Sequence, residues 1–139
     1  MEDRIRKSET RQSRVILPSL LNDHGILFGG IALQWLDEVA YITATRFIRK
    51  RLVTVSVEKV NFILPVYSGM LIEIVGNITK VKSVKLEVKV ELFVEEMYTE
   101  KKQKALEAIF TFAAVDLDHK PIPLFPTSIN YRNRVISGT

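Results

Sequence analysis

The chain contains no cysteine and only two histidines, His24 and His119. The absence of cysteine excludes disulfides, thiolate nucleophiles and most zinc sites, and it makes a cytoplasmic location the default expectation. The sequence also lacks the G-x-S-x-G elbow of serine hydrolases, the G-x-x-x-x-G-K-[ST] phosphate-binding loop and the H-E-x-x-H zinc motif. We therefore expect no metal site, and we look for chemistry among carboxylates, amides and backbone groups.

Long apolar runs are missing as well. The one segment of membrane length, residues 31–48, carries Gln34, Asp37 and Glu38, and two acids near the centre of a bilayer disfavour a span. The N-terminal residues are charged and lack the apolar run of a signal peptide. We expect neither secretion nor a membrane span.

The composition fits one globular domain. The chain has 139 residues, of which 47% are apolar and 26% charged, values that disfavour disorder. The net charge of +4 favours an anionic partner. A nucleic-acid-binding domain is disfavoured, because the basic residues are scattered among acids and no aromatic side chains interleave with them on one strand face.

Hydrophobic periodicity predicts one long helix among strands. Residues 1–12 are polar and expected to be flexible, and residues 127–139 are expected to form a C-terminal tail. The helix begins at Gly29 or Gly30, after a glycine-rich turn, and it is apolar nearly all round, which predicts that other structure wraps it. The strands are expected within residues 13–21, 53–64, 70–81, 83–96 and 105–115.

These elements predict an α+β fold in which a curled antiparallel β-sheet wraps around one long central helix. In residues 53–64 the alternation of apolar positions changes phase after Val57, which predicts a bulge or sharp bend. Because one helix cannot cover all the apolar strand faces, we expect the chain to form a homo-oligomer.

The most informative pattern is Asn22-x-x-Gly25-x-x-x-Gly29-Gly30 followed by Asp37. Two glycines at a helix start leave backbone N–H groups unobstructed at the positive end of the helix dipole, which suits a carbonyl oxygen that gains negative charge. We expect Asp37 to be buried, so that desolvation raises its pKa and makes it a better base or a poised nucleophile.

Each feature also has an ordinary structural explanation. A Gly-Gly pair before a helix is often only a cap or a close packing contact, and an acid within a helix usually faces solvent or a salt bridge. In a helix with almost no polar face, the two together favour function. Glu38 lies about 100° round the helix from Asp37 and is expected to be structural or a secondary contributor to the site.

The chain resembles the hotdog-fold thioesterases, and more narrowly the acyl-CoA hydrolases of the YciA and brain acyl-CoA hydrolase branch. The resemblance covers about residues 15–126, and we expect a single hotdog domain over residues 13–126. The similar segments follow in the same order: Phe28-Gly29-Gly30, Trp35-Leu36-Asp37-Glu38-Val39-Ala40, Val53-Thr54-Val55, Val60-Asn61-Phe62-x-x-Pro65-Val66-x-x-Gly69 and Ala113-Ala114-Val115-Asp116.

The resemblance implies an acyl-CoA thioesterase that releases a free acid and CoA without a cofactor, since CoA is part of the substrate. By this resemblance Asp37 is the general base or the nucleophile, Asn22 positions the carbonyl or the water, and the Gly30 N–H polarises the thioester. We expect the substrate also to contact His24, Phe28, Gly29, Thr54, Lys82 and Ser83.

One segment departs from the family. Proteins of this branch carry a Gly-Arg-Ser-Ser type of turn before the fourth strand, where this chain has Lys82-Ser83-Val84-Lys85. Lysine lacks the bidentate fork of arginine but still binds phosphate. The alternative for Lys82 and Lys85 is a solvated strand edge.

Helix geometry predicts a site shared between two chains. Seven residues of helix separate Asp37 from Gly30 by about 10 Å along the axis, too far for attack on a carbonyl held at the same helix start. A homodimer supplies the missing carboxylate, and dimers are expected to assemble into a tetramer or a hexamer. The other functions considered are a non-catalytic acyl-thioester binder or sensor on the same fold, and a hotdog dehydratase, for which His24 is the only nearby histidine.

Overall fold

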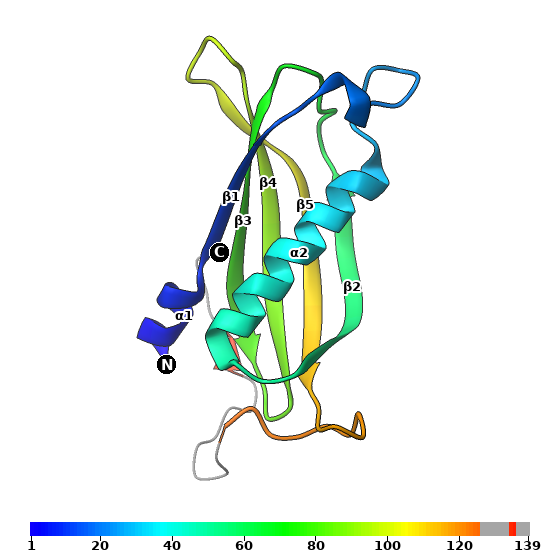
Figure 1. Ribbon diagram of the computed structural model, residues 1–139. Coiled ribbons are helices and arrows are strands. Elements are labelled where there is room, and N and C mark those ends of the chain that lie inside the picture. Colours follow the sequence, from blue (N-terminus) through cyan, green and yellow to red (C-terminus); the bar gives the residue numbers. More distant parts are fainter. Residues whose placement is uncertain (126–133, 136–139) are drawn as a thin grey trace.

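The computed structural model describes residues 1–125 and the backbone of 134–135. A sheet of long antiparallel strands curves around one long helix, α2, which lies on its concave side (Figure 1). The elements are α1 (Glu2–Ser8), β1 (Thr10–Val15), the short 3-10 turn η1 (Pro18–Leu20), α2 (Gly29–Ile48), β2 (Leu52–Phe62), β3 (Leu71–Val81), β4 (Lys85–Glu95), β5 (Lys102–Ala114) and β6 (Arg134–Val135).

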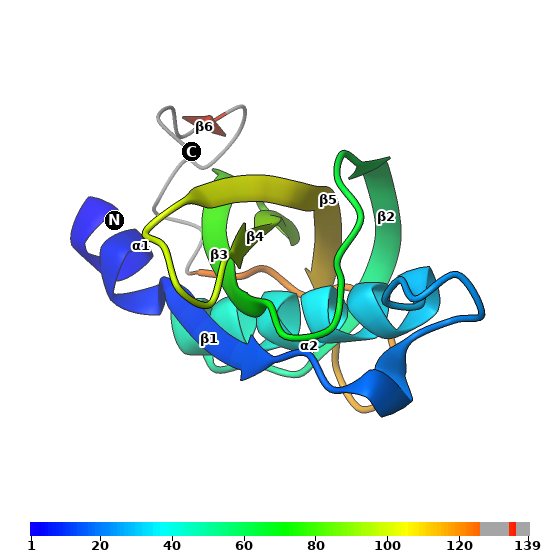
Figure 2. The same cartoon turned by 90° about the horizontal axis from the view of Figure 1, so that it is seen from above.

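The strands are ordered β1-β3-β4-β5-β2, and β6 pairs with the end of β3. Seen from above, the sheet encloses α2 on three sides, with β1 and β2 at its two edges (Figure 2). The predicted α+β hotdog fold is confirmed, and the helix begins at Gly29 as expected.

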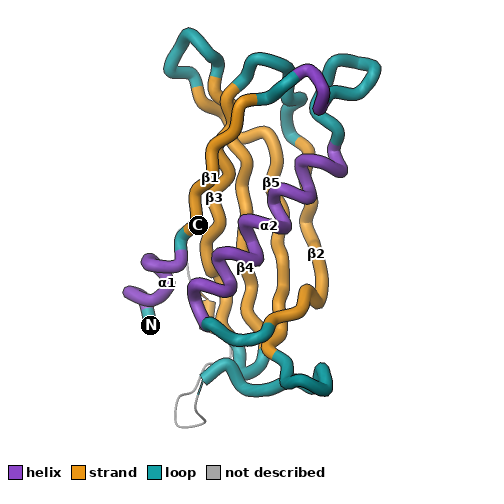
Figure 3. The backbone as a smooth tube through the Cα atoms, viewed as in Figure 1, coloured by secondary structure: helices purple, strands orange, loops and turns teal. Residues whose placement is uncertain are grey.

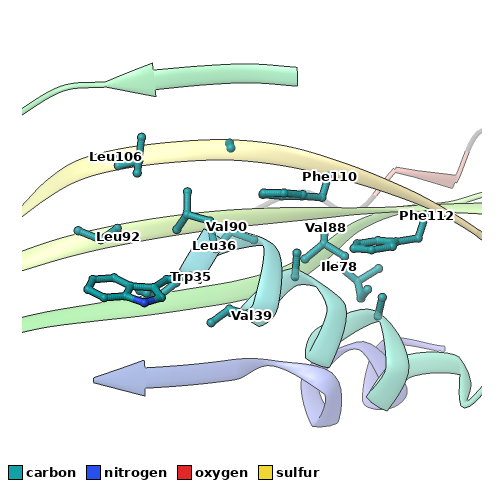
Figure 4. Close-up of a cluster of buried hydrophobic side chains, with 14 of the residues drawn as sticks. Trp35, Leu36, Val39, Ile78, Val88, Val90, Leu92, Leu106, Phe110 and Phe112 are labelled. Atoms are coloured by element: carbon teal, nitrogen blue, oxygen red, sulfur yellow. The ribbon is translucent and has the colours of Figure 1, made fainter. Parts of the chain in front are cut away.

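The core lies between the concave face of the sheet and the inner face of α2. The strand residues that contribute to it occupy every second position, as expected for strands with one buried face. They meet the helix in a continuous apolar cluster that includes Trp35, Leu36, Val39, Ile78, Val88, Val90, Leu92, Leu106, Phe110 and Phe112 (Figure 4). Burial of this cluster fixes the position of α2 against the sheet.

Gly76 lets the helix approach the sheet closely. A Cβ atom at this position in β3 would collide with the Thr43 hydroxyl and would lie 3.0 Å from a methyl carbon of Val39, both on α2. The glycine is therefore required by helix-to-sheet packing.

Strand β2 is irregular and exposed. Its pairing with β5 shifts register between Thr54 and Ser56 and again between Glu58 and Asn61, and Lys59 has a φ of 52°. These shifts confirm the predicted bulge. The strand forms an edge of the sheet and leaves several large apolar side chains exposed: Val55, Val57, Val60 and Phe62.

Two expectations differ from the structure. Residues 1–12, expected to be flexible, form α1 and the first part of β1, because Ile5 packs into the core and the Arg4 side chain donates to the backbone carbonyl of Phe47 at the end of α2. The first strand accordingly runs over Thr10–Val15, earlier than predicted. Of the expected tail, residues 127–139, only β6 lies within the described residues.

The predicted wrapping of α2 is incomplete in a single chain. Gly30, Gln34, Asp37, Glu38 and Tyr41 are all exposed on its outer face. The expectation that Asp37 is buried is therefore wrong for one chain alone, because neither edge strand reaches over this face. Among the described residues, no helix is both long and apolar enough to cross a membrane.

Candidate active site

The loop before α2 is shaped by Asn22. Its side-chain oxygen Oδ1 accepts hydrogen bonds from the backbone N–H groups of His24 and Ile26, at 2.9 and 3.1 Å. The backbone N–H of Asn22 donates to the carbonyl of Ile26 at 2.7 Å, and Gly25 has a φ of 74° that favours glycine. The carboxamide oxygen is thus used within the loop, and the Nδ2 group is the part of Asn22 that can donate to a ligand.

The start of α2 offers free backbone donors. Phe28 is the N-cap residue and supplies no side-chain cap, and the first turn contains no acid. The N–H groups of Ile31 and Ala32 both donate to the Phe28 carbonyl at 3.1 Å. No hydrogen bond within residues 1–125 uses the N–H of Gly29 or Gly30, so both remain available to an oxyanion at the positive end of the helix.

The two glycines face different surroundings. A Cβ atom on Gly29 would lie 3.2 Å from the ring of Phe62, whereas a Cβ atom on Gly30 would meet nothing within 4 Å. Packing in one chain therefore explains Gly29 but not Gly30. The open space at Gly30 is what a ligand approaching the backbone requires.

The two acids of α2 face opposite edges of the sheet. Glu38 lies 3.5 Å from the Arg14 guanidinium of β1, which in turn lies 4.5 Å above the ring of Trp35. Glu38 therefore has the structural partner expected of it.

Asp37 lies on the side of α2 that leads toward β2. Tyr41, one turn further on, meets the edge of the Phe112 ring at a centroid distance of 6.1 Å, and Phe112 pairs with Thr54 of β2. No hydrogen bond or ion pair within the described residues involves the Asp37 carboxylate. Desolvation by neighbouring atoms, followed by repulsion from Glu38, raises the pKa of Asp37, which suits a base.

The structure brings together only some of the predicted site residues. Asn22, His24, Phe28, Gly29 and Gly30 lie in the loop and at the helix start, at one end of the sheet (Figure 3). The His24 side chain is exposed, and its nearest charged neighbour is Asp23 at 3.8 Å. The ring of Phe28 is 49% exposed.

Lys82 and Ser83 lie at the opposite end, in the connection between β3 and β4 (Figure 1). The length of β3, about 33 Å for its eleven residues, separates this connection from the loop. Thr54 lies near the same far end, early in β2, and shares the concave face with Phe112. One chain therefore cannot present all the predicted residues to one carbonyl group.

A cavity of about 230 Å³ lies beside the helix start. It is lined by the loop before α2, the first turn of α2, the end of β2, the connection from β2 to β3, and residues of β4 and β5; it is partly open to solvent, and its wall is almost entirely apolar. The lining residues are Ile26, Leu27, Gly29, Ala32, Phe62, Ile63, Leu64, Pro65, Val66, Leu92, Ala105 and Leu106. The sequence analysis did not find this cavity, because its walls come from four separate segments.

A second, basic hollow of about 450 Å³ lies at the far end of the sheet. Lys80, Lys82 and Lys85 line it together with Ser56, Thr111 and two acids, Glu58 and Glu87. Lys80 lies 3.9 Å from Glu87, and the Ser56 hydroxyl donates to Glu58 at 3.3 Å. Lys80 and Lys85 thus join the predicted Lys82, a grouping that depends on the hairpin between β3 and β4. In the part of the chain that the structure describes, no group of three or more His, Cys, Asp or Glu side chains could hold a metal ion.

Part of the chain matches a known protein family. Residues 24–101, more than half of the chain, match the thioesterase superfamily. The matched segment includes most of the loop, all of α2 and strands β2 to β4.

Two curated relatives illustrate the match. The acyl-CoA thioester hydrolase YkhA of Bacillus subtilis, described as uncharacterized, is 29% identical over 119 residues that cover 86% of this chain and 69% of the relative. The cytosolic acyl coenzyme A thioester hydrolase of Rattus norvegicus is 32% identical over 136 residues, covering 94% of this chain. The chain spans only 36% of the length of the rat protein.

Solved structures agree with the fold. An acyl-CoA hydrolase from Staphylococcus aureus, solved with butyryl coenzyme A, coenzyme A and coenzyme A disulfide, has a TM-score of 0.81 at 28% identity and covers 86% of this chain and 73% of its own. Variants of that protein with one aspartate, one threonine or one asparagine replaced by alanine have also been solved. An acyl-CoA thioesterase described as hexameric has a TM-score of 0.82 at 32% identity and covers 86% of this chain and 76% of its own.

Proposed function

The chain belongs to the thioesterase superfamily, and on this premise we propose that it hydrolyses acyl-CoA thioesters to a free acid and CoA. The observation that carries the proposal is the pair of free N–H groups at Gly29 and Gly30, beside the Asn22 loop and one strand-length from a basic hollow. The names of the relatives and of the solved structures support acyl-CoA as the substrate class.

The reaction needs an oxyanion site and a base. The Gly30 N–H and the Nδ2 group of Asn22 donate to the thioester carbonyl oxygen, which gains negative charge when the carbonyl carbon is attacked. Asp37 accepts a proton from the attacking water, the C–S bond breaks, and the proton returns to the departing CoA thiolate. In the alternative course Asp37 attacks the carbonyl carbon directly and the C–S bond breaks to release the CoA thiolate. Water then hydrolyses the resulting anhydride to the free acid and the Asp37 carboxylate, and the proton released is taken up by the thiolate.

The spacing of three residues supports these roles. In the Staphylococcus aureus protein, the replaced asparagine and aspartate are 15 positions apart, and the aspartate and threonine are 17 positions apart. Asn22, Asp37 and Thr54 have the same separations here. Thr54 is therefore the residue of β2 that we assign to the site, where its hydroxyl can hold the attacking water or the Asp37 carboxylate.

The site is shared between two protomers. Asp37 is exposed in one chain and about 10 Å along the axis from Gly30, while the exposed edge strand β2 offers unpaired backbone groups and apolar side chains to a second copy. Antiparallel pairing of two β2 strands brings the loop end of one chain toward the Lys82 end of the other. The hexameric relatives support further assembly of such dimers, and a tetramer is the alternative.

The basic hollow suits the phosphates of CoA. Lys82 and Lys85 provide two ammonium groups that make no ion pair within the described residues, Lys80 adds a third that lies 3.9 Å from Glu87, and Thr111 adds a hydroxyl donor. Ser83 lies in the same connection, and its carbonyl accepts a hydrogen bond from Leu124 at 2.8 Å. This pairing fixes the turn that carries Lys82, so we assign to Ser83 the shaping of the nucleotide site.

Release of free thiol from acyl-CoAs of rising chain length tests the proposal. Wild type should turn over at least part of the series, and Asp37→Ala should reduce kcat by about a hundredfold or more, as loss of a base or nucleophile does. Glu38→Ala is the matched control, because the neighbouring carboxylate is paired with Arg14 and points to the other edge.

Equal rates for wild type and Asp37→Ala would refute the catalytic assignment. Tight acyl-CoA binding with no turnover would instead favour the non-catalytic acyl-thioester binder. A cytoplasmic location, in keeping with the cytosolic rat relative, stays a prediction.

A further inference from the structure

We propose that the acyl chain of the substrate enters the apolar cavity beside Gly29, and that Ala32 and Phe62 limit the length of chain that the protein accepts. The inference rests on the proposed function and specifies the acyl part of its substrate.

The cavity lies next to the proposed oxyanion site. Gly29 forms part of its wall and precedes Gly30, whose N–H is free. Adjacent Cα atoms are about 3.8 Å apart, so a thioester carbonyl held at Gly30 has its acyl carbons at the cavity entrance. Several backbone N–H groups of the wall are already paired: Leu27 donates to the Val66 carbonyl at 2.8 Å, and Ile63 and Leu64 donate to the Ala105 carbonyl at 2.8 and 3.1 Å. The wall is therefore almost entirely apolar, and its free backbone donor, the Gly29 N–H, lies at the end next to Gly30, where the thioester carbonyl is held.

The volume of the cavity sets the expected length. An apolar protein cavity of about 150 Å³ accommodates one benzene molecule, so a cavity of about 230 Å³ has room for roughly nine carbon atoms. A medium-length acyl chain fits within one protomer, and a longer chain must displace a side chain or extend out of the cavity.

Two residues are placed to control that limit. Ala32 lies one helical turn after Gly29 and is 4% exposed, so a larger side chain there projects into the cavity. The Phe62 ring contacts the Gly29 position from the opposite side and is 57% exposed in one chain, so it forms the outer wall of the cavity. Ala32→Leu should shorten the cavity, and Phe62→Ala should open it.

Two measurements on the 139-residue chain separate this inference from the proposed function. Hydrolysis is followed across acyl-CoAs from two to sixteen carbons, and binding is followed by calorimetry with non-hydrolysable thioether analogues of the same lengths. For Ala32→Leu, kcat/KM and affinity should fall about tenfold or more for the longest chains that wild type accepts, while butyryl-CoA is little affected. Phe62→Ala should shift the preference toward longer chains.

Controls protect the result from unfolding and assembly effects. Tyr98→Ala removes an aromatic ring that is 95% exposed in the hairpin between β4 and β5 and does not line the cavity, so it should leave the length profile unchanged. If Ala32→Leu does not fold, Ile63→Trp fills the cavity from a position that is already 44% exposed. Gel filtration verifies that each variant keeps the wild-type mass.

An unchanged length profile in all cavity variants, or an equal loss at every chain length, would overturn the inference and leave thioester hydrolysis standing. If a side chain of the partner protomer fills the cavity, the length profile is likewise unchanged and the inference is overturned. Length-dependent binding of the analogues without hydrolysis by wild type would refute the proposed function and support the cavity.

Discussion

Two inactive variants, mixed together, test whether the catalytic site is shared between chains. One variant is Asp37→Ala and the other Asn22→Ala. If each site takes Asn22 and Gly30 from one protomer and Asp37 from its partner, every homodimer is inactive. A heterodimer then contains one site with both residues intact and one site that lacks both.

The recovered activity follows from counting sites. A site is intact only if its loop comes from the Asp37→Ala chain and its carboxylate from the Asn22→Ala chain. In a random equimolar mixture this holds for about one site in four, so about one quarter of the wild-type activity returns. Heterodimers purified through two different tags should recover about one half. The same count applies to a tetramer or a hexamer, because each site still joins two chains.

The choice of loop variant matters because Asn22 also shapes the loop. Its Oδ1 accepts the N–H groups of His24 and Ile26, so Asn22→Ala leaves two donors without this acceptor. A second mixture uses Asn22→Asp, which keeps an acceptor for the loop and removes the Nδ2 donor. Thiol release from a saturating acyl-CoA is the assay. Stable, tag-purified heterodimers without activity in both mixtures would refute the shared site and place both residues in one chain.

Four further outcomes are expected. Asp37→Asn should raise the free energy of unfolding at pH 7, and with it the melting temperature. The gain should be no more than about 1 kcal/mol, because the group is exposed. Since the folded chain raises the pKa of this carboxyl above 3.8, its charge destabilises the fold above that raised pKa. The gain should therefore vanish below about pH 3.8, where both states are protonated, and a gain that persists at pH 3 would contradict this account. Gly30→Ala should stabilise the chain by up to about 1 kcal/mol, since alanine is the better helix former, yet it should lower kcat/KM. Gly29→Ala should stabilise the chain less, because a phenylalanine ring lies 3.2 Å from the new Cβ atom. Val57→Lys should reduce the mass measured by light scattering to that of one chain and abolish activity while the far-UV spectrum is kept, because it adds a charge to the exposed edge strand. Lys82→Ala should raise KM for acyl-CoA about two- to fivefold and leave hydrolysis of acyl N-acetylcysteamine thioesters, which lack the nucleotide, unchanged.

Local patterns were sufficient for the elements of the fold. Periodicity and glycine placement predict the start of α2 at Gly29, the four long strands and the bulge in β2. They do so because the burial of one face imposes a period of two on strands and a wider apolar stripe on the helix. The same approach did not predict the structure of residues 1–12. Their polar composition hides the two apolar side chains, Ile5 and Met1, that pack α1 and its N-terminal cap against the core.

The site was predictable only in part. The sequence singles out Asn22, Gly30 and Asp37, since free amides at a helix start and a carboxylate within an apolar helix are local features. It predicts a buried Asp37, whereas the single chain leaves that residue exposed, because sequence patterns do not reveal which face of a helix the sheet covers.

The sequence by itself determines the elements, their order and the chemical groups available for a reaction, because each depends on residues that are close in the chain. Only the tertiary structure decides which groups meet. It directs Glu38 toward Arg14 at one edge and the side of α2 that bears Asp37 toward β2 at the other, and it separates Lys82 from Gly30 by the length of β3. It also builds the apolar cavity from four segments, since cavities and shared edges arise from the packing of residues that are distant in the chain.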